Sequence, residues 1–156
     1  MKTDTPTNLH NMFTDKVIII SGSTQGIGLV TAEMLIHRGA RLVINSRSHE
    51  KVEKALFYLR KITPNVIGLA GDVSNYEFCL DLRNYVMEEF GRIDILINNA
   101  SAIQLTDTEH TPSKRFDLMQ SINVRGTFLV VQHALPYLRK STHAHILTLS
   151  PPINLA

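Results

Sequence analysis

Short apolar runs alternate along this chain with longer stretches of helical periodicity. The runs are nearly continuous in Val, Ile and Leu, so both faces of each strand need cover, which is typical of a parallel sheet between helices. Right-handed crossovers then predict a doubly wound α/β fold with the strand order 3-2-1-4-5. The expected strands cover residues 16–21, 41–45, 65–70, 93–97 and 144–149.

The expected helices lie between these strands. The first covers 27–38 with Gly39 as its stop, and the second covers 50–61. The third is capped by Ser74 or Asn75 and ends at Phe90. A long helix covers 112–140, in which Pro136 predicts a kink or an early end.

The composition fits one globular domain. With 156 residues, 44% hydrophobic and 19% charged, the chain can fill one core, and a net charge of +2 is too small to indicate a nucleic-acid surface. We expect no signal peptide, because residues 1–15 are polar, and no membrane span, because no window approaches about 20 apolar residues. The single cysteine, Cys79, excludes an intramolecular disulfide, is expected in the core, and fits the cytoplasm or another reducing intracellular compartment.

A glycine-rich turn follows the first expected strand, with the spacing Gly-x-x-x-Gly-x-Gly. Such a turn needs backbone torsions that glycine reaches at low energy, and it lets the main chain approach a pyrophosphate at the start of the next helix. In the first strand–helix–strand unit this spacing predicts dinucleotide binding, with a plain tight turn as the alternative. We therefore expect a polar extension over 1–15 and a partial dinucleotide-binding domain over 16–156. The predicted contacts in the turn are Gly22, Ser23, Thr24, Gln25, Gly26, Ile27 and Gly28.

The end of the second expected strand favours NADP over NAD. An acidic side chain at this place would bond the 2′-hydroxyl of NAD and repel the 2′-phosphate of NADP. The chain instead has Ser46 and Arg47, with no carboxylate until Glu50. Arg47 can pair with a phosphate through its forked donors and Ser46 can add a hydroxyl. A basic residue in place of Gln25 would have strengthened this prediction, and a solvated Arg47 with NAD as the cofactor is the alternative.

Further motifs follow the glycine turn along the chain: Gly71-Asp72-Val73, Ile95-Leu96-Ile97-Asn98-Asn99-Ala100, Ile122-Asn123-Val124-Arg125-Gly126, and the last expected strand up to Ser150. In this order and spacing, the glycine turn and these segments resemble the short-chain dehydrogenase/reductase family. The resemblance covers nearly the whole chain and implies a Rossmann-type sheet and an NAD(P)-dependent oxidoreductase. Residues 98–103, 111–119 and 150–152 are similar to its hydroxysteroid dehydrogenase-like branch.

The resemblance also implies roles for single residues along the cofactor. Asp72 would bond the adenine amino group, and Val73 would pack beside the ring. Asn99, Ala100 and Ser101 would line the cofactor, with Ser101 in place of the family's usual glycine.

The resemblance implies that two residues lie near the reacting atoms. Asn123 would hold a water in a proton relay, and the alternative is a buried structural amide. Ser150 would orient the substrate carbonyl, but Pro151 stands where the family often has a second serine, so the role can also lie elsewhere.

The family's Tyr-x-x-x-Lys acid–base pair does not occur in these 156 residues. A free tyrosine near pKa about 10 is a poor base at neutral pH without a nearby lysine. None of the four tyrosines has a lysine four residues later: Tyr58, Tyr76, Tyr85 and Tyr137. We therefore expect a C-terminally truncated piece of a longer reductase that forms homo-oligomers and acts on a small carbonyl or alcohol. The alternatives are a non-catalytic dinucleotide-binding module and an inactive truncated product. No metal site is expected, because His143 and His145 have no acidic or cysteine neighbour in sequence.

Overall fold

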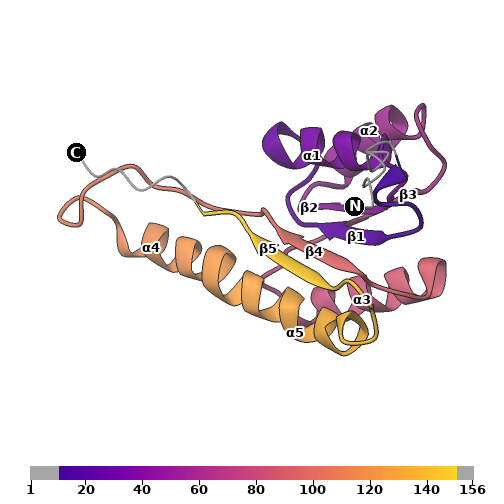
Figure 1. Cartoon of the computed structure of the whole chain (residues 1–156). Coiled ribbons are helices and arrows are strands. Elements are labelled where there is room, and N and C mark those ends of the chain that lie inside the picture. The colour runs from indigo at the N-terminus through magenta and orange to yellow at the C-terminus, as the bar shows by residue number, and fades with distance from the viewer. Residues whose placement is uncertain (1–10, 151–156) are drawn as a thin grey trace, which may run out of the picture.

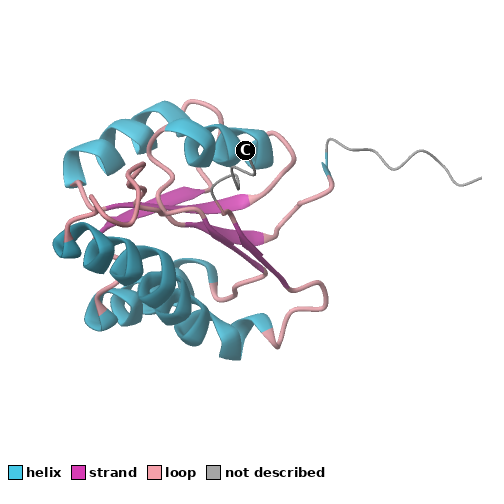
Figure 2. Cartoon of the chain, turned by 90° about the vertical axis from the view of Figure 1, so that its left-hand side faces the viewer, coloured by secondary structure: helices cyan, strands magenta, loops and turns pink. Residues whose placement is uncertain are grey.

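The computed structural model describes residues 11–150, which form a parallel sheet with helices on both faces (Figures 1 and 2). The strand order is β3-β2-β1-β4-β5, and every neighbouring pair is parallel. The predicted α/β class and strand order are confirmed. The strands are β1 (Val17–Ile20), β2 (Arg41–Ser46), β3 (Val66–Ala70), β4 (Ile95–Asn98) and β5 (His145–Thr148).

Four connections carry the helices that cover the sheet. They are α1 (Gly26–Ile36), α2 (His49–Leu59), α3 (Tyr76–Phe90) and a long segment that comprises α4 (Ser113–Met119), η2 (Gln120–Gly126) and α5 (Thr127–Leu138). Asn75 caps α3, because its side chain accepts a hydrogen bond from the Phe78 N–H at 2.7 Å. Pro136 lies within α5, which ends at Leu138.

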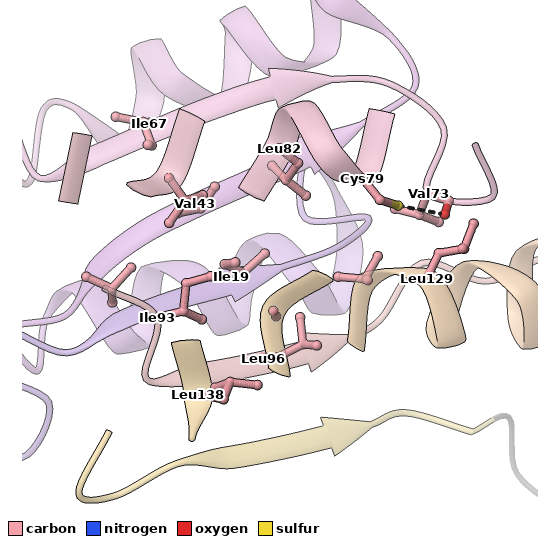
Figure 3. Packing of buried hydrophobic residues seen from close by; sticks show 14 residues of the cluster. Ile19, Val43, Ile67, Val73, Cys79, Leu82, Ile93, Leu96, Leu129 and Leu138 are labelled. Carbon is pink, nitrogen blue, oxygen red and sulfur yellow. Dashed lines mark hydrogen bonds between the residues drawn. The ribbon is translucent and has the colours of Figure 1, made fainter. Parts of the chain in front are cut away.

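The alternation of side chains along the strands divides the core into two layers. Ile18, Ile20 and Ile44 face α1 and α2, whereas Ile19 and Val43 face the opposite layer. Figure 3 shows that second layer, in which Leu82 and Cys79 of α3 and Leu129 and Leu138 of α5 meet the strands. Because both faces of the central strands are buried, their sequences show no polar alternation.

The helical stretch predicted over 112–140 is helical from Ser113 to Leu138, but it is not one regular α-helix. Residues Gln120–Gly126 form a π-helical turn between two α-helices. Asn123 lies within this turn, and its side chain bonds the backbone of Ala102 twice, at 2.9 Å each. Gly126 lies against Val73, since a Cβ at this position would come within 2.8 Å of the Val73 Cγ2. These two contacts with other segments accompany the departure from regular α-helical geometry.

Candidate functional site

A cavity of about 360 Å³ lies at the carboxyl ends of the central strands. Its walls come from the end of β2, from the segments that follow β1, β2, β3 and β4, from the first turns of α1 and α2, and from η2. Every predicted cofactor contact except Ser23 lines this cavity. The lining residues are Gly22, Thr24, Gln25, Gly26, Ile27, Gly28, Asn45, Ser46, Arg47, Lys51, Gly71, Asp72, Val73, Asn99, Ala100, Ser101 and Ile122.

The three glycines of the turn serve different local needs. Gly22 and Gly26 have positive φ angles of 63° and 55°. A Cβ on Gly22 would come within 2.8 Å of the Ala100 Cα, and one on Gly28 within 2.6 Å of the Gly22 carbonyl oxygen. A Cβ on Gly26 would meet nothing within 4 Å. Gly22 and Gly28 therefore let chain segments approach each other, while Gly26 leaves space on the open side of the turn.

Ser23 holds the turn from inside. Its hydroxyl donates to the Ile20 carbonyl at 2.6 Å and accepts a hydrogen bond from the Asn45 N–H at 3.0 Å. The residue is fully buried, so its side chain connects β1 to β2 and does not reach the cavity.

Asn99 fixes the turn from the side of β4. Its amide donates to the carbonyl oxygens of Ser21 at 3.0 Å and Gly22 at 2.8 Å. In return, the Ser21 hydroxyl accepts hydrogen bonds from the N–H groups of Asn99 and Ala100, each at 3.0 Å. Because two strand ends hold the same turn, its shape is set before any ligand binds.

Positive charge gathers where β2 ends. Arg47 lies in the loop after the strand, Lys51 lies in the first turn of α2, and both line the cavity. The Lys51 ammonium donates to the Gln25 Oε1 at 3.1 Å, which brings it next to the glycine turn. Glu50 does not line the cavity, and its carboxylate pairs with Lys54 at 2.6 Å. Lys51 was not predicted from the sequence, because its contact with Gln25 spans 26 residues and only its place four residues after Arg47, at the start of a helix, hinted at it.

Asp72 and Val73, which follow β3, form a further part of the cavity wall. One carboxylate oxygen of Asp72 accepts hydrogen bonds from the Ser74 N–H at 2.9 Å and the Ser74 hydroxyl at 2.8 Å. Val73 is buried against the glycine of the π-helical turn. A polar group and an apolar surface therefore stand side by side, which is a suitable arrangement for the edge and face of a heterocyclic base.

Asn123 and Ser150, the two predicted catalytic residues, do not line the cavity. The Asn123 amide donates to the Ala102 carbonyl and accepts from the Ala102 N–H, so its side chain connects the π-helical turn to the loop after β4. Ser150 is exposed and follows β5 at the same carboxyl edge of the sheet. The roles of both residues in a reaction stay predictions.

The tyrosines lie on helices away from the cavity. A hydrogen bond to Glu33 raises the pKa of Tyr58, and burial raises the pKa of Tyr85. Both shifts are opposite to the one that a tyrosine base needs. Burial also raises the pKa of Cys79 to about 11, and its thiol donates to the Val73 carbonyl (Figure 3), so this cysteine is a packing residue.

Two further kinds of feature are absent from residues 11–150. They contain no helix with the length and apolarity to cross a bilayer. Within the same range, no three His, Cys, Asp or Glu side chains come together in a way that could hold a metal ion.

The family model described as short chain dehydrogenase matches residues 16–153. The chain belongs to this family. Over 145 residues it is 40% identical to the hydroxysteroid dehydrogenase-like protein 2 of Rattus norvegicus, a match that covers 88% of this chain and 28% of the rat protein. The chain therefore spans less than a third of that relative's length.

Several solved structures have a fold similar to that of this chain. A short-chain dehydrogenase from Mycobacterium thermoresistibile has a TM-score of 0.85 and 37% identity, over 91% of this chain and 53% of its own. NAD⁺-bound xylitol dehydrogenase has a TM-score of 0.83 and 28% identity, over 88% of this chain and 53% of its own. The L-sorbose reductase of Gluconobacter frateurii, in complex with NADPH and L-sorbose, has a TM-score of 0.83 and 26% identity, over 89% of this chain and 53% of its own. Similar solved folds therefore include both an NAD⁺-bound and an NADPH-bound protein.

Proposed function

We propose that this chain is the cofactor-binding part of a short-chain dehydrogenase/reductase and that it binds NADP(H) in preference to NAD(H). The observation that carries the proposal is the cavity itself. The glycine turn, the Ser46–Arg47 loop and the Asp72–Val73 wall, which are far apart in sequence, line one space at the carboxyl edge of the sheet. Ligands of open α/β sheets bind at this edge, where the strand order reverses.

The glycine turn suits a pyrophosphate. The helix α1 begins at Gly26, and the preceding Gln25 makes no side-chain cap hydrogen bond. The first N–H groups of the helix therefore have no competing cap, and they point with the helix dipole toward an anion at the turn. The open space beside Gly26 gives the anion access to these donors.

The remaining walls suit the other parts of the cofactor. Asp72 would accept a hydrogen bond from the adenine amino group, and Val73 would lie against the ring. Arg47 and Ser46 would bind the 2′-phosphate, where an acidic side chain would repel it. The cofactor would then run past the backbone at Asn99, Ala100 and Ser101 on its way to the carboxyl edge of β5.

A bound nicotinamide supplies or accepts a hydride, and the substrate class that goes with it is a small carbonyl or alcohol. In this proposal Ser150 would orient that carbonyl, and Asn123 would hold a relay water. The acid–base pair must come from outside these 156 residues, since they contain no Tyr-x-x-x-Lys. By itself the chain is therefore expected to bind the cofactor without turnover, and the longer enzyme is expected to form homo-oligomers.

Titration of the 156-residue chain with NADPH and with NADH tests the proposal. Calorimetry should give an affinity for NADPH at least about tenfold higher than for NADH, because each charge-assisted phosphate contact contributes about 1.4 kcal/mol. Arg47→Ala should lower that preference by about tenfold. If the folded chain binds neither cofactor, the proposal is contradicted. If it binds NADH more tightly than NADPH, only the assignment of the 2′-phosphate to the end of β2 is contradicted. Oxidation of NADPH with simple carbonyl compounds should not occur with this chain.

A further inference from the structure

Lys51 lies where α2 meets the candidate cofactor cavity. Ser48 caps this helix, and its hydroxyl accepts a hydrogen bond from the Lys51 N–H at 3.3 Å. The cap fixes the start of α2 directly after the Ser46–Arg47 loop. The Lys51 side chain then crosses the cavity wall, and its ammonium reaches the Gln25 Oε1 at 3.1 Å. Two elements therefore define the position of this one charge.

Lys51 and Arg47 take part in no ion pair within residues 11–150. Glu50, the nearest acid in sequence, is paired with Lys54. Lys51 contacts a neutral amide oxygen, which a doubly charged phosphate can replace as a stronger partner. Two cations thus line the same cavity, and neither has an ion-pair partner among the described residues.

We propose that Lys51 is a specificity-determining residue that pairs with the 2′-phosphate of NADP(H) alongside Arg47, and that Gln25 is the positioning residue that holds its ammonium at the cavity wall. The inference rests on the proposed function, because it assigns a further residue to the same site. The two cations complement each other, since Arg47 offers a planar fork of donors and Lys51 a compact charge. Lys51 thereby supplies the basic group near the glycine turn that Gln25 itself lacks.

Calorimetric titrations with two pairs of ligands separate the 2′-phosphate from the rest of the cofactor. The pairs are NADPH with NADH, and 2′,5′-ADP with 5′-AMP, which differ only in that phosphate. Lys51→Ala should weaken NADPH and 2′,5′-ADP by about tenfold and leave NADH and 5′-AMP nearly unchanged. Gln25→Ala should reduce the preference for the 2′-phosphate by a smaller factor, because it removes the hydrogen bond that positions the Lys51 ammonium but keeps the charge.

Lys61→Ala is the matched control. Lys61 lies just past the end of the same helix, does not line the cavity and forms no ion pair within residues 11–150, so its removal should change no affinity in either pair. Thermal unfolding of each variant verifies the fold, and Lys51→Gln repeats the test with the length of the side chain largely kept. The slope of NADPH affinity against salt concentration should also fall in the Lys51 variants, since one charge pair is lost.

Each other outcome has a separate meaning. Equal loss for NADPH and NADH in Lys51→Ala places the lysine on the shared pyrophosphate and overturns the inference. An unchanged NADPH affinity in Lys51→Ala, with the preference lost in Arg47→Ala, overturns the inference and leaves the proposed function standing. A wild-type chain that binds none of the four ligands overturns both.

Discussion

Gly28 and Gly26 lie two positions apart in one turn, and the structure separates their roles. A Cβ on Gly28 would come within 2.6 Å of the Asn99 Nδ2 and of the Gly22 oxygen, and within 2.8 Å of the Ser23 Cα. Backbone atoms cannot move away as a flexible side chain can, so Gly28→Ala should destabilise the fold by about 2–3 kcal/mol. Gly26→Ala meets only the strain of a positive φ, about 1 kcal/mol, and should mainly weaken NADPH binding.

Urea unfolding and NADPH titration of both variants check this contrast. The midpoint of unfolding should fall further for Gly28→Ala than for Gly26→Ala, with similar slopes. Equal losses of stability would show that the close approach of Gly28 to Asn99 does not persist in solution.

The roles of some single residues could be predicted from the sequence, whereas those of others could not. The glycine turn was predictable because its spacing is local and its backbone needs are specific to glycine. The inward direction of the Ser23 side chain was not, since it depends on the carbonyl of Ile20 and the N–H of Asn45, which belong to two strands. Lys51 was missed for the same reason, because its partner Gln25 becomes a neighbour only after β1 and β2 pair.

The strands and helices followed the apolar pattern closely, and the exception was the π-helical turn. Helical periodicity continues through residues 120–126, so nothing local predicted the change. A buried structural amide was one of the two interpretations that the sequence offered for Asn123. The pairing with Ala102 supplies such an anchor and draws the loop after β4 toward the helix.

Asp94 joins the starting ends of three strands, at the opposite edge of the sheet from the cavity. It is fully buried and accepts hydrogen bonds from Arg92 at 2.7 and 2.8 Å, from the Val17 N–H at 3.0 Å and from the Ser141 hydroxyl. Its carbonyl accepts from the His145 N–H at 3.2 Å. Burial by itself would raise the pKa of Asp94, but the hydrogen bonds from Arg92, Ser141 and Val17 outweigh it and hold the pKa below its ordinary value.

The lowered pKa of Asp94 gives stability a definite dependence on pH. The ionised form contributes fully above the ordinary aspartate pKa of about 3.9, and this contribution is lost as the pH falls through the lower, folded-state pKa. Asp94→Asn should lower the free energy of unfolding by about 2 kcal/mol at neutral pH, because it removes charge-assisted hydrogen bonds. The variant should also lose less stability than the wild type on acidification below this range.

Urea unfolding at a series of pH values measures both effects. Asp81→Asn on the exposed face of α3 is the control, and it should leave the neutral-pH stability nearly unchanged. Parallel acid profiles for the wild type and Asp94→Asn would show that the Asp94 network does not hold the three strands together.

Across the fold as a whole, the strands of the sheet are not equally buried. The central strands β1 and β2 are almost entirely buried, whereas all four residues of β5 are exposed. Within the described residues β5 pairs only with β4, and Ile146 and Leu147 are 45% and 54% exposed. Phe128, on the neighbouring helix α5, is 61% exposed. An apolar edge strand of this kind is a preferred place for local opening and association.

The rates of amide hydrogen exchange in the strands should therefore follow how deeply each strand is buried. We expect the β5 amides to exchange faster than those of β1, because β5 has one paired neighbour and little apolar burial to hold it closed. Bound NADPH should slow exchange in the glycine turn, residues 22–28. It should leave the fast exchange of β5 unchanged, since the candidate cavity is lined by the end of β2 and by the segments that follow β1 to β4, and not by β5.

Exchange measured by mass spectrometry at two protein concentrations completes the test. Protection of β5 equal to that of β1 at both concentrations would contradict the open edge, whereas protection that grows with concentration would mean that copies of the chain cover this edge.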